Sequence, residues 1–311
     1  MPTIKPDWYC IVNPHAGSGK TMQEWRIAEK KLTTLEVPFK TTLTNYRFHA
    51  TKLSYEAALH GYRKLLAVGG DGSVHEILSG IMQYVDESGT PPEDFTLAVI
   101  PIGSGNDWIK TNNIPHDTEK VVKLIAKESF GMMDIIRVET SAGRTYMANV
   151  GGTGFDSHVC ERVNALKESG KRSSRIYINS LLHTIFHLRR FNTTVIADGS
   201  KVFEGLAYSI ALGNGPYSGG GMRQVPLAVN DDGFLDYMIV PKVSLFRIIK
   251  EMGRLFKGNV HEVKCLVSGK CRELTISGGD IVEVDGEIKG NLPLKVSVTG
   301  SQIRVLKRPK S

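Results

Sequence analysis

Three glycine-rich segments in the first third of the chain combine adaptable backbone with carboxylate and hydroxyl side chains. They are Asn13-Pro14-His15-Ala16-Gly17, Gly69-Gly70-Asp71-Gly72-Ser73 and Gly103-Ser104-Gly105-Asn106-Asp107. Glycines at a helix start bring bare backbone N–H groups against a phosphate, and a carboxylate such as Asp71 can face a metal ion held between phosphates. These residue types indicate phosphate chemistry, although each turn alone also fits an ordinary strand-to-helix connection.

The first segment continues into Gly-Ser-Gly-Lys-Thr at 17–21, which resembles the end of an ATPase P-loop. The P-loop requires a glycine five residues before its last glycine, and Pro14 stands there without the N–H group that the loop would use. The segment therefore does not match the P-loop pattern. A strand, a turn of small residues and a helix start can still hold phosphate without that motif.

Short apolar strands alternate with helical segments over residues 8–130. We expect strands at 8–13, 39–44, 64–68 and 96–101. Helices are expected at 19–34, 49–60 and 73–84, and further helices are expected between the fourth strand and about residue 128. This alternation predicts a parallel sheet. Because the carboxyl ends of parallel strands share one edge, the three glycine-rich segments should converge on one crevice.

Strand patterns dominate from about residue 133 onward. Asp198-Gly199, Ser268-Gly269 and Asp285-Gly286 each stand between extended runs, as hairpin turns do. Helices are expected only at 174–190 and 243–257. We predict two domains, an α/β domain over residues 1–132 and a mainly antiparallel β domain over 133–311.

Composition narrows the class of protein. The 311 residues are 41% hydrophobic and 23% charged, and no apolar run approaches the roughly 20 residues needed to cross a bilayer. The start, MPTIKPDW, lacks an apolar signal core, so a cytoplasmic location is expected.

The net charge of +7 favours anionic partners, but the basic residues look scattered and no nucleic-acid-binding motif organises them. Buried thiols are favoured over zinc or disulfides for Cys10, Cys160, Cys265 and Cys271, which lack C-x-x-C spacing.

The order of the segments resembles the diacylglycerol kinase catalytic family, the soluble lipid kinases that include bacterial diacylglycerol kinases and the sphingosine and ceramide kinases. The resemblance rests on NPxxG at 13–17, GGDG-S-x-x-E at 69–76 and PIGSGND at 101–107. It covers nearly the whole chain, because similar segments follow in the same order at 151–156, 213–226, 231–236 and 285–287. GGDG also occurs in NAD kinases and phosphofructokinases, but the later GGGM and DGE segments favour the lipid kinases.

The resemblance implies a three-layer α/β domain with a parallel sheet, followed by an antiparallel β-sandwich, with the active-site cleft between them. It also implies that the last strand, near 302–307, returns to the first domain. The implied ATP site comprises Asn13, Pro14, Ala16, Gly17, Thr44, Gly69, Gly70, Asp71, Gly72, Ser73 and Ser104. The family often has threonine at the last two positions, and serine keeps the hydroxyl.

Phosphoryl transfer needs a neutralised γ-phosphate, a positioned acceptor hydroxyl and a base. Asp71 and Asp107, from adjacent turns, could bind Mg²⁺ directly or through water. The resemblance places Glu287, with Asp285 beside it, as the proton acceptor, and which of the two is the base stays open. Family members hold a structural Mg²⁺ that would use Val229, Asp232 and Phe234 here, although a plain Asp-Gly turn explains the same residues.

Two helical segments carry further candidate side chains. His183 and His187 are spaced i, i+4, but the zinc-protease pattern needs glutamate where Thr184 stands, so we expect core or surface histidines. One face of helix 243–257 is apolar and the opposite face is basic. Packing on the β domain is the favoured use of the apolar face, formed by Leu245, Ile248, Ile249, Met252, Leu255 and Phe256, and contact with a membrane is the alternative.

We therefore predict an ATP- and Mg²⁺-dependent kinase that phosphorylates a hydroxyl of a membrane lipid, of diacylglycerol or sphingoid type. An NAD kinase-like phosphotransferase and an inactive nucleotide- or lipid-binding module are the alternatives. The expected partners are the lipid and an anionic membrane surface, met transiently at its inner face, and no nucleic acid. The resemblance also suggests a homodimer.

Overall fold

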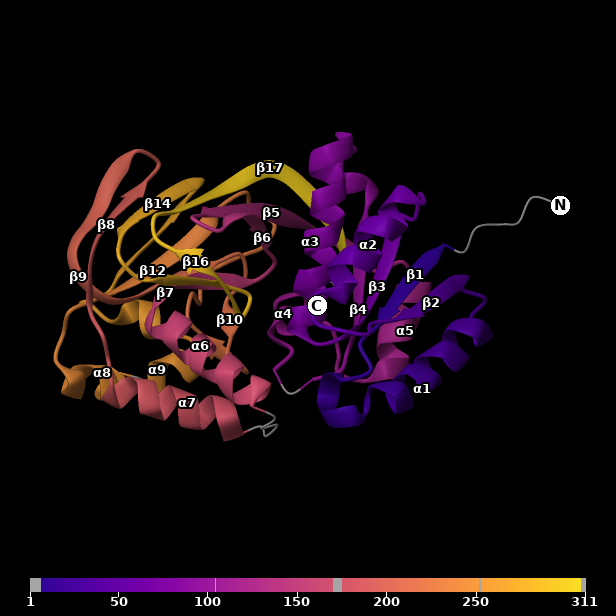
Figure 1. The fold of residues 1–311 in the computed structure, drawn as a ribbon, viewed down its shortest axis with the longest axis horizontal. Helices are drawn as coiled ribbons and strands as arrows, with labels where there is room; N and C mark the ends of the chain where they lie inside the picture. Colours follow the sequence, from indigo (N-terminus) through magenta and orange to yellow (C-terminus); the bar gives the residue numbers. More distant parts are fainter. Residues whose placement is uncertain (1–6, 104, 170–174, 252, 309–311) are drawn as a thin grey trace. The chain divides into compact units, whose positions relative to one another are not determined.

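The computed structural model describes residues 7–103, 105–169, 175–251 and 253–308 (Figure 1). Its chain divides into two compact units. The first comprises Met1–Met133 and Ser301–Ser311, and the second comprises Asp134–Gly300. Within the described ranges, no helix combines the length and the apolar character that a bilayer-spanning helix requires.

A parallel sheet forms the centre of the first unit, with strand order β17-β4-β3-β1-β2. Its strands are β1 (Trp8–Val12), β2 (Phe39–Leu43), β3 (Lys64–Gly69), β4 (Thr96–Pro101) and the end of β17 (Leu294–Leu306). The three middle strands are runs of buried, mainly apolar residues, as expected for strands covered on both faces, whereas β2 is only partly buried. The last strand joins this sheet because Arg304 and Val305 pair with Thr96 and Leu97.

Helices cover both faces of this sheet. Figure 1 shows α1 and α5 on one face and α2 and α3 on the other. The helices of the unit are α1 (Thr21–Thr34), α2 (His49–Leu59), α3 (Asp71–Ser88), α4 (Asp107–Thr111) and α5 (Thr118–Ala126), with short 3₁₀ turns η1 (Ala16–Gly19) and η2 (Pro92–Asp94). Helix α3 begins two residues before the predicted start, with Gly70 as its N-cap, so GGDG itself forms the helix N-terminus.

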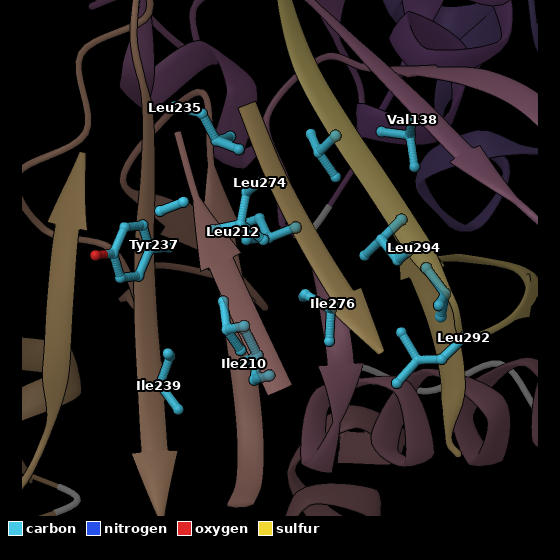
Figure 2. Packing of buried hydrophobic residues seen from close by; sticks show 14 of the residues in the cluster. Val138, Ile210, Leu212, Leu235, Tyr237, Ile239, Leu274, Ile276, Leu292 and Leu294 are labelled. Atoms are coloured by element: carbon cyan, nitrogen blue, oxygen red, sulfur yellow. The ribbon is translucent and has the colours of Figure 1, made fainter. Parts of the chain in front are cut away.

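The second unit is an antiparallel β-sandwich. Strand β9 pairs with β8 near its start and with β7 and β12 near its end. The strands are β5 (Phe130–Thr140), β6 (Gly143–Met147), β7 (Val150–Gly154), β8 (Phe191–Ala197), β9 (Ser200–Gly213), β10 (Tyr217–Ser218), β11 (Met222–Arg223), β12 (Leu235–Pro241), β13 (Val267–Cys271), β14 (Glu273–Gly278), β15 (Ile281–Val284), β16 (Glu287–Asn291) and the start of β17. Figure 2 shows part of the apolar core, with side chains from β9, β12, β14 and β17.

Two of the three predicted hairpin turns are present. Asp198-Gly199 joins β8 to β9 and Asp285-Gly286 joins β15 to β16, with positive φ at all four residues as a type I′ turn requires. The prediction at Ser268-Gly269 was wrong, because both residues lie inside β13 and pair with β12. Glycine is needed there for packing: a Cβ on Gly269 would lie 2.5 Å from the Tyr237 hydroxyl.

The helices of the second unit differ from the prediction. The sequence did not predict α6 (Phe155–Glu168), which follows the glycine-rich strand β7 and buries Val159 and Val163. Helix 174–190 is α7 (Arg175–Phe186), and Ser174 lies outside the described residues. Helix 243–257 is two helices, α8 (Leu245–Glu251) and α9 (Gly253–Lys257), followed by the 3₁₀ turn η3 (Val260–Glu262).

A contact between α6 and the turn before β15 makes stability depend on pH. His158 Nε2 lies 3.1 Å from Asp280 Oδ1, and this hydrogen bond raises the pKa of the imidazole above its ordinary value. The folded state therefore binds the proton more tightly than the unfolded state. The stabilisation is complete below about pH 6.5, and it is lost as the pH rises through the folded pKa.

We expect Asp280→Asn to lower the free energy of unfolding by roughly 1 kcal/mol at pH 5.5 and by much less at pH 8.5. Urea unfolding at the two pH values measures both losses. Equal losses would show that Asp280 stabilises the fold through its bond to the Ile281 N–H group and not through His158.

Candidate functional site

The glycine-rich segments of the first unit follow β1, β3 and β4 at the same edge of the sheet. Backbone hydrogen bonds join them: Ile102 N donates to Gly69 O at 2.7 Å, and Asn13 N donates to Val68 O at 3.0 Å. Thr44 follows β2 at this edge and donates its N–H group to Val12 O at 2.9 Å. The convergence expected from the parallel sheet is therefore present in the first unit.

Glycines allow the second and third turns to fold tightly on themselves. A Cβ on Gly69 would lie 2.2 Å from Ser73 Oγ, and a Cβ on Gly103 would lie 2.9 Å from Asn106 Oδ1. Side chains at these positions would displace the groups that line the edge. The N-terminus of the 18-residue helix α3 opens at the same edge, where its dipole and N–H groups favour an anion.

Asp71 joins the second turn to the third. Its carboxylate accepts the N–H groups of Asp107 and Trp108, each at 3.0 Å, and so caps the start of α4. Asp107 is buried and forms an ion pair with Lys110 at 2.8 Å. Both carboxylates flank Gly105, because a Cβ there would lie 3.4 Å from Asp71 Oδ2 and 4.0 Å from Asp107 Oδ2.

Asn106 adds a third oxygen to this group. It has positive φ, is buried, and donates its amide N–H to Gly103 O at 2.9 Å. Among the described residues, its Oδ1 atom is one of twelve buried side-chain nitrogen and oxygen atoms with no hydrogen-bond partner. A carbonyl oxygen in that situation favours a cation or a donor from a ligand.

These oxygens suit Mg²⁺ bound together with a nucleotide. Mg²⁺ in kinases is held by one or two carboxylates, by substrate phosphates and by water, and not by a full cage of protein ligands. The described part of the chain contains no cluster of three or more His, Cys, Asp or Glu side chains that could hold a metal. Asp71, Asn106 and Asp107 fit such a shared site.

A wide hollow of about 990 Å³ adjoins the other flank of the first and third turns, where α1 and α5 begin. Gly17 and Gly103 line it, but Asp71 and Asp107 do not. Since the carboxylates lie elsewhere, this hollow is not where metal-bound phosphates would sit.

In the second unit, Asp285 holds the backbone of a neighbouring turn. Its Oδ2 atom accepts the Ala148 N–H at 2.7 Å, and its Oδ1 atom accepts the N–H groups of Asn149 at 2.9 Å and Val150 at 3.2 Å. A carboxylate with three backbone donors is held in place as a structural acceptor. Glu287, two residues later, opens β16 and is only partly buried.

Acidic groups gather around this hairpin. Glu283 is buried, and its Oε2 atom accepts the Gly286 N–H at 2.9 Å. Burial raises the pKa of Glu283 well above its ordinary value, and the nearby charges of Asp156, Asp285 and Glu287 add to that rise. Proton-binding groups with altered pKa values are common at catalytic sites, although structural clusters produce them too.

In the turn predicted to hold a second Mg²⁺, the aspartate already pairs with a lysine from β13. Asp232 Oδ1 accepts the Phe234 N–H at 3.1 Å, and Asp232 Oδ2 pairs with Lys270 Nζ at 2.5 Å. Lys270 also lies 3.5 Å from the buried Asp236. The role of Val229, Asp232 and Phe234 as metal ligands stays a prediction.

A cavity of about 110 Å³ lies inside the second unit. Its apolar lining includes Leu181 and Ile185 from α7, Ile248 from α8 and Leu255 from α9. Its wall also contains a buried polar group: Asp156 accepts the Ser209 hydroxyl at 2.7 Å and the Gln224 amide at 2.5 Å, and burial raises its pKa. An apolar space with a buried carboxylate suits an amphiphile. The volume is below the roughly 150 Å³ of a cavity that admits benzene, so the cavity has room only for the end of a lipid chain.

Family models cover almost the whole chain. Residues 7–138 match the diacylglycerol kinase catalytic domain, and residues 149–307 match the YegS C-terminal NAD kinase beta sandwich-like domain. The chain belongs to the diacylglycerol kinase catalytic family. The resemblance stated from the motifs is thereby confirmed, as is the fold class of a parallel α/β domain with an antiparallel β-sandwich.

Individual proteins support the family and the fold. This lipid kinase family member is 26% identical to the diacylglycerol kinase of Mycobacterium tuberculosis (strain CDC 1551 / Oshkosh), over 96% of this chain and 94% of that protein. Its fold is similar to a crystal structure of a diacylglycerol kinase from Bacillus anthracis str. Sterne, with TM-score 0.73, 20% identity, and coverage of 98% and 97%. An NAD kinase from Archaeoglobus fulgidus in complex with ATP shares the fold more distantly, with TM-score 0.52, 13% identity, and coverage of 97% and 94%.

Sequence reasoning missed Asn106 and Asp156 as candidate site residues of this family member, and it missed the buried Glu283 beside the hairpin. Asn106 and Asp156 lie within segments that carry the resemblance, and both are polar residues in glycine-rich segments, which was an available signal. Glu283 lies in an apolar strand and gave no such signal. Ser104, which the resemblance places in the ATP site, lies outside the described residues.

Proposed function

We propose that this protein is an ATP- and Mg²⁺-dependent kinase that transfers the γ-phosphate of ATP to a hydroxyl group of a membrane lipid. The observation that carries the proposal is the set of Asp71, Asn106 and Asp107 oxygens at the edge of the parallel sheet where β3 and β4 end. The apolar cavity with Asp156 in its wall supports a lipid as the acceptor.

ATP would be held by the turns of the first unit. The proposed contacts come from Asn13, Pro14, Ala16 and Gly17, from Thr44, from Gly69 to Ser73, and from Ser104. Backbone N–H groups at the start of α3 would bind phosphate oxygens, and the hydroxyl of Ser73 lies beside Gly69 at the same edge. Asp71 and Asp107 would hold Mg²⁺, with Asn106 as an added oxygen ligand.

The metal, when bound, neutralises charge that develops on the transferring phosphoryl group. The remaining steps belong to side chains of the protein. Glu287 would accept the proton of the lipid hydroxyl, and Asp285 would fix the hairpin that carries Glu287 through its three backbone hydrogen bonds. We also propose a cytoplasmic enzyme that contacts the inner face of the membrane transiently. A homodimer stays a prediction.

A panel of acceptors tests the function. The purified protein would be incubated with γ-labelled ATP, Mg²⁺ and mixed micelles containing diacylglycerol, sphingosine, ceramide or phosphatidylglycerol, with NAD as a soluble acceptor. We expect label to appear in one class of lipid and none in NAD. Phosphorylation of NAD alone would favour the NAD kinase-like alternative, and ATP binding without transfer to any acceptor would favour an inactive binding module.

A further inference from the structure

Helices α7 and α8 of the second unit expose large apolar side chains to solvent. Phe246 is 78% exposed, Phe186 is 71% exposed and Leu182 is 48% exposed. Side chains on another face of the same helices, Leu181 and Ile185 from α7 and Ile248 from α8, line the apolar cavity. Each helix is therefore apolar on a buried face and also on part of its outer face, and the outer apolar groups need a partner to cover them.

The positive charge of the sequence is concentrated in two segments that contain α7 and α8. Segment 169–190 contains five Lys and Arg residues and no Asp or Glu, and segment 243–258 contains four Lys and Arg residues and one Glu. Because the whole chain carries +7, the rest of the sequence is close to neutral. This corrects the interpretation of the basic residues as scattered.

Glu251, the one acidic residue of these segments, does not neutralise the basic residues near the exposed apolar side chains. Glu251 forms an ion pair with Arg254 at 2.6 Å. Arg189, Arg190, Arg247 and Lys250 are exposed. Phe246 and Lys250, one helical turn apart on α8, share a face.

We propose that this part of the second unit docks onto an anionic lipid bilayer. The docking surface consists of Leu182, Phe186, Arg189, Arg190, Phe246, Arg247 and Lys250. The phenylalanines would enter the boundary between headgroups and acyl chains, and the arginines and lysine would contact the phosphates of anionic lipids. A second copy of the chain is a poorer partner, because two surfaces of the same positive charge repel each other.

The docking surface deepens the proposed function and rests on it, because a kinase of membrane lipids must reach an acceptor that stays in the bilayer. Helices α7 and α8 contribute side chains both to the docking surface and to the lining of the cavity. A lipid chain leaving the bilayer at this surface would meet the cavity next. In Figure 1, α7, α8 and α9 lie along the same edge of the second unit.

Vesicle binding of the full chain, which needs neither ATP nor turnover, tests the proposal. The protein would be sedimented with vesicles of phosphatidylcholine alone or with 30 mol% phosphatidylglycerol. We expect binding only to the second kind, and weaker binding as NaCl rises from 50 to 500 mM, because exposed charges are screened beyond about 8 Å at physiological ionic strength. The double variant Phe186→Ala/Phe246→Ala should bind at least about 10-fold more weakly, and Arg189→Gln/Arg190→Gln should reduce the dependence on salt.

Leu59→Ala is the matched control, because Leu59 is 57% exposed but lies on α2 of the first unit, and we expect unchanged binding. Phe246→Trp adds a direct readout: its fluorescence should be quenched by brominated lipid, whereas Trp8, Trp25 and Trp108 are buried in the first unit. The docking surface would be overturned if both double variants bound vesicles as the wild type does. It would also be overturned if brominated lipid did not quench the fluorescence of Phe246→Trp. Two further outcomes would overturn it: a dimeric wild type that becomes monomeric in the double phenylalanine variant, or tighter binding of the protein to RNA than to vesicles.

Activity separates this proposal from the proposed function. The double phenylalanine variant should phosphorylate dihexanoylglycerol in solution at the wild-type rate and lose activity only on long-chain lipid in vesicles. A wild-type protein that docks on vesicles but phosphorylates no lipid would support the docking surface and overturn the proposed function.

Discussion

Glu287→Gln should reduce kcat by roughly 10²–10⁴-fold while the affinity for ATP changes little. Glutamine keeps the length and shape of the side chain but cannot accept the proton of the lipid hydroxyl. Steady-state kinetics with the preferred lipid, together with calorimetric titration of ATP, would separate the loss of chemistry from any loss of binding.

Two variants of the same hairpin serve as controls. Glu283→Gln makes the same chemical change four residues away, and the amide oxygen can still accept the Gly286 N–H. Because burial raises the pKa of Glu283, its charged form costs stability at pH 8, so the variant should be at least as stable as the wild type and as active.

Asp285→Asn should instead cost about 1–3 kcal/mol, since one amide oxygen cannot replace a carboxylate that accepts three N–H groups. Its folded fraction should keep most of its activity. If Asp285→Asn is inactive and Glu287→Gln is active, the roles within Asp285-Gly286-Glu287 are reversed. Full activity in both would show that the second unit does not supply the base.

Asp71→Asn should lower kcat by at least roughly 100-fold, because a charge that faces the metal disappears from the transition state. The structure adds a second expectation. Asp71 accepts two N–H groups at the start of α4, and asparagine keeps only one acceptor, so stability should fall by about 1 kcal/mol. Calorimetry should show weaker binding of Mg²⁺ together with ATP, independently of turnover.

Asp117→Asn is the control for the capping role of Asp71. Asp117 caps α5 by accepting the Lys120 N–H at 2.8 Å, and it is not part of the proposed metal site. Asparagine is about as good an N-cap as aspartate, so this variant should keep both stability and activity. If Asp71→Asn proves as mild as Asp117→Asn, Asp71 acts only as a helix cap and the proposed metal site is wrong.

The sequence alone predicted the features that depend on short stretches of chain. The order of apolar strands and helical segments predicted the parallel sheet, and the parallel sheet predicted that the turns at 13–17, 69–73 and 103–107 would meet. The turns at Asp198-Gly199 and Asp285-Gly286 were predicted because a type I′ turn needs positive φ at two adjacent residues. The spacing of the motifs was enough to indicate the family.

Only the tertiary structure decided what several of these residues contact. Asp71 caps α4, 36 residues further on, and Asp285 binds a turn about 135 residues before it. Ser268-Gly269 has turn-forming residues, yet pairing with β12 holds it in a strand. Whether an apolar helical residue lines the cavity, as Ile248 does, or stays exposed, as Phe246 does, depends on which elements pack against the helix. Local preferences act over a few residues, whereas these contacts join distant segments that only the packing of the whole chain brings together.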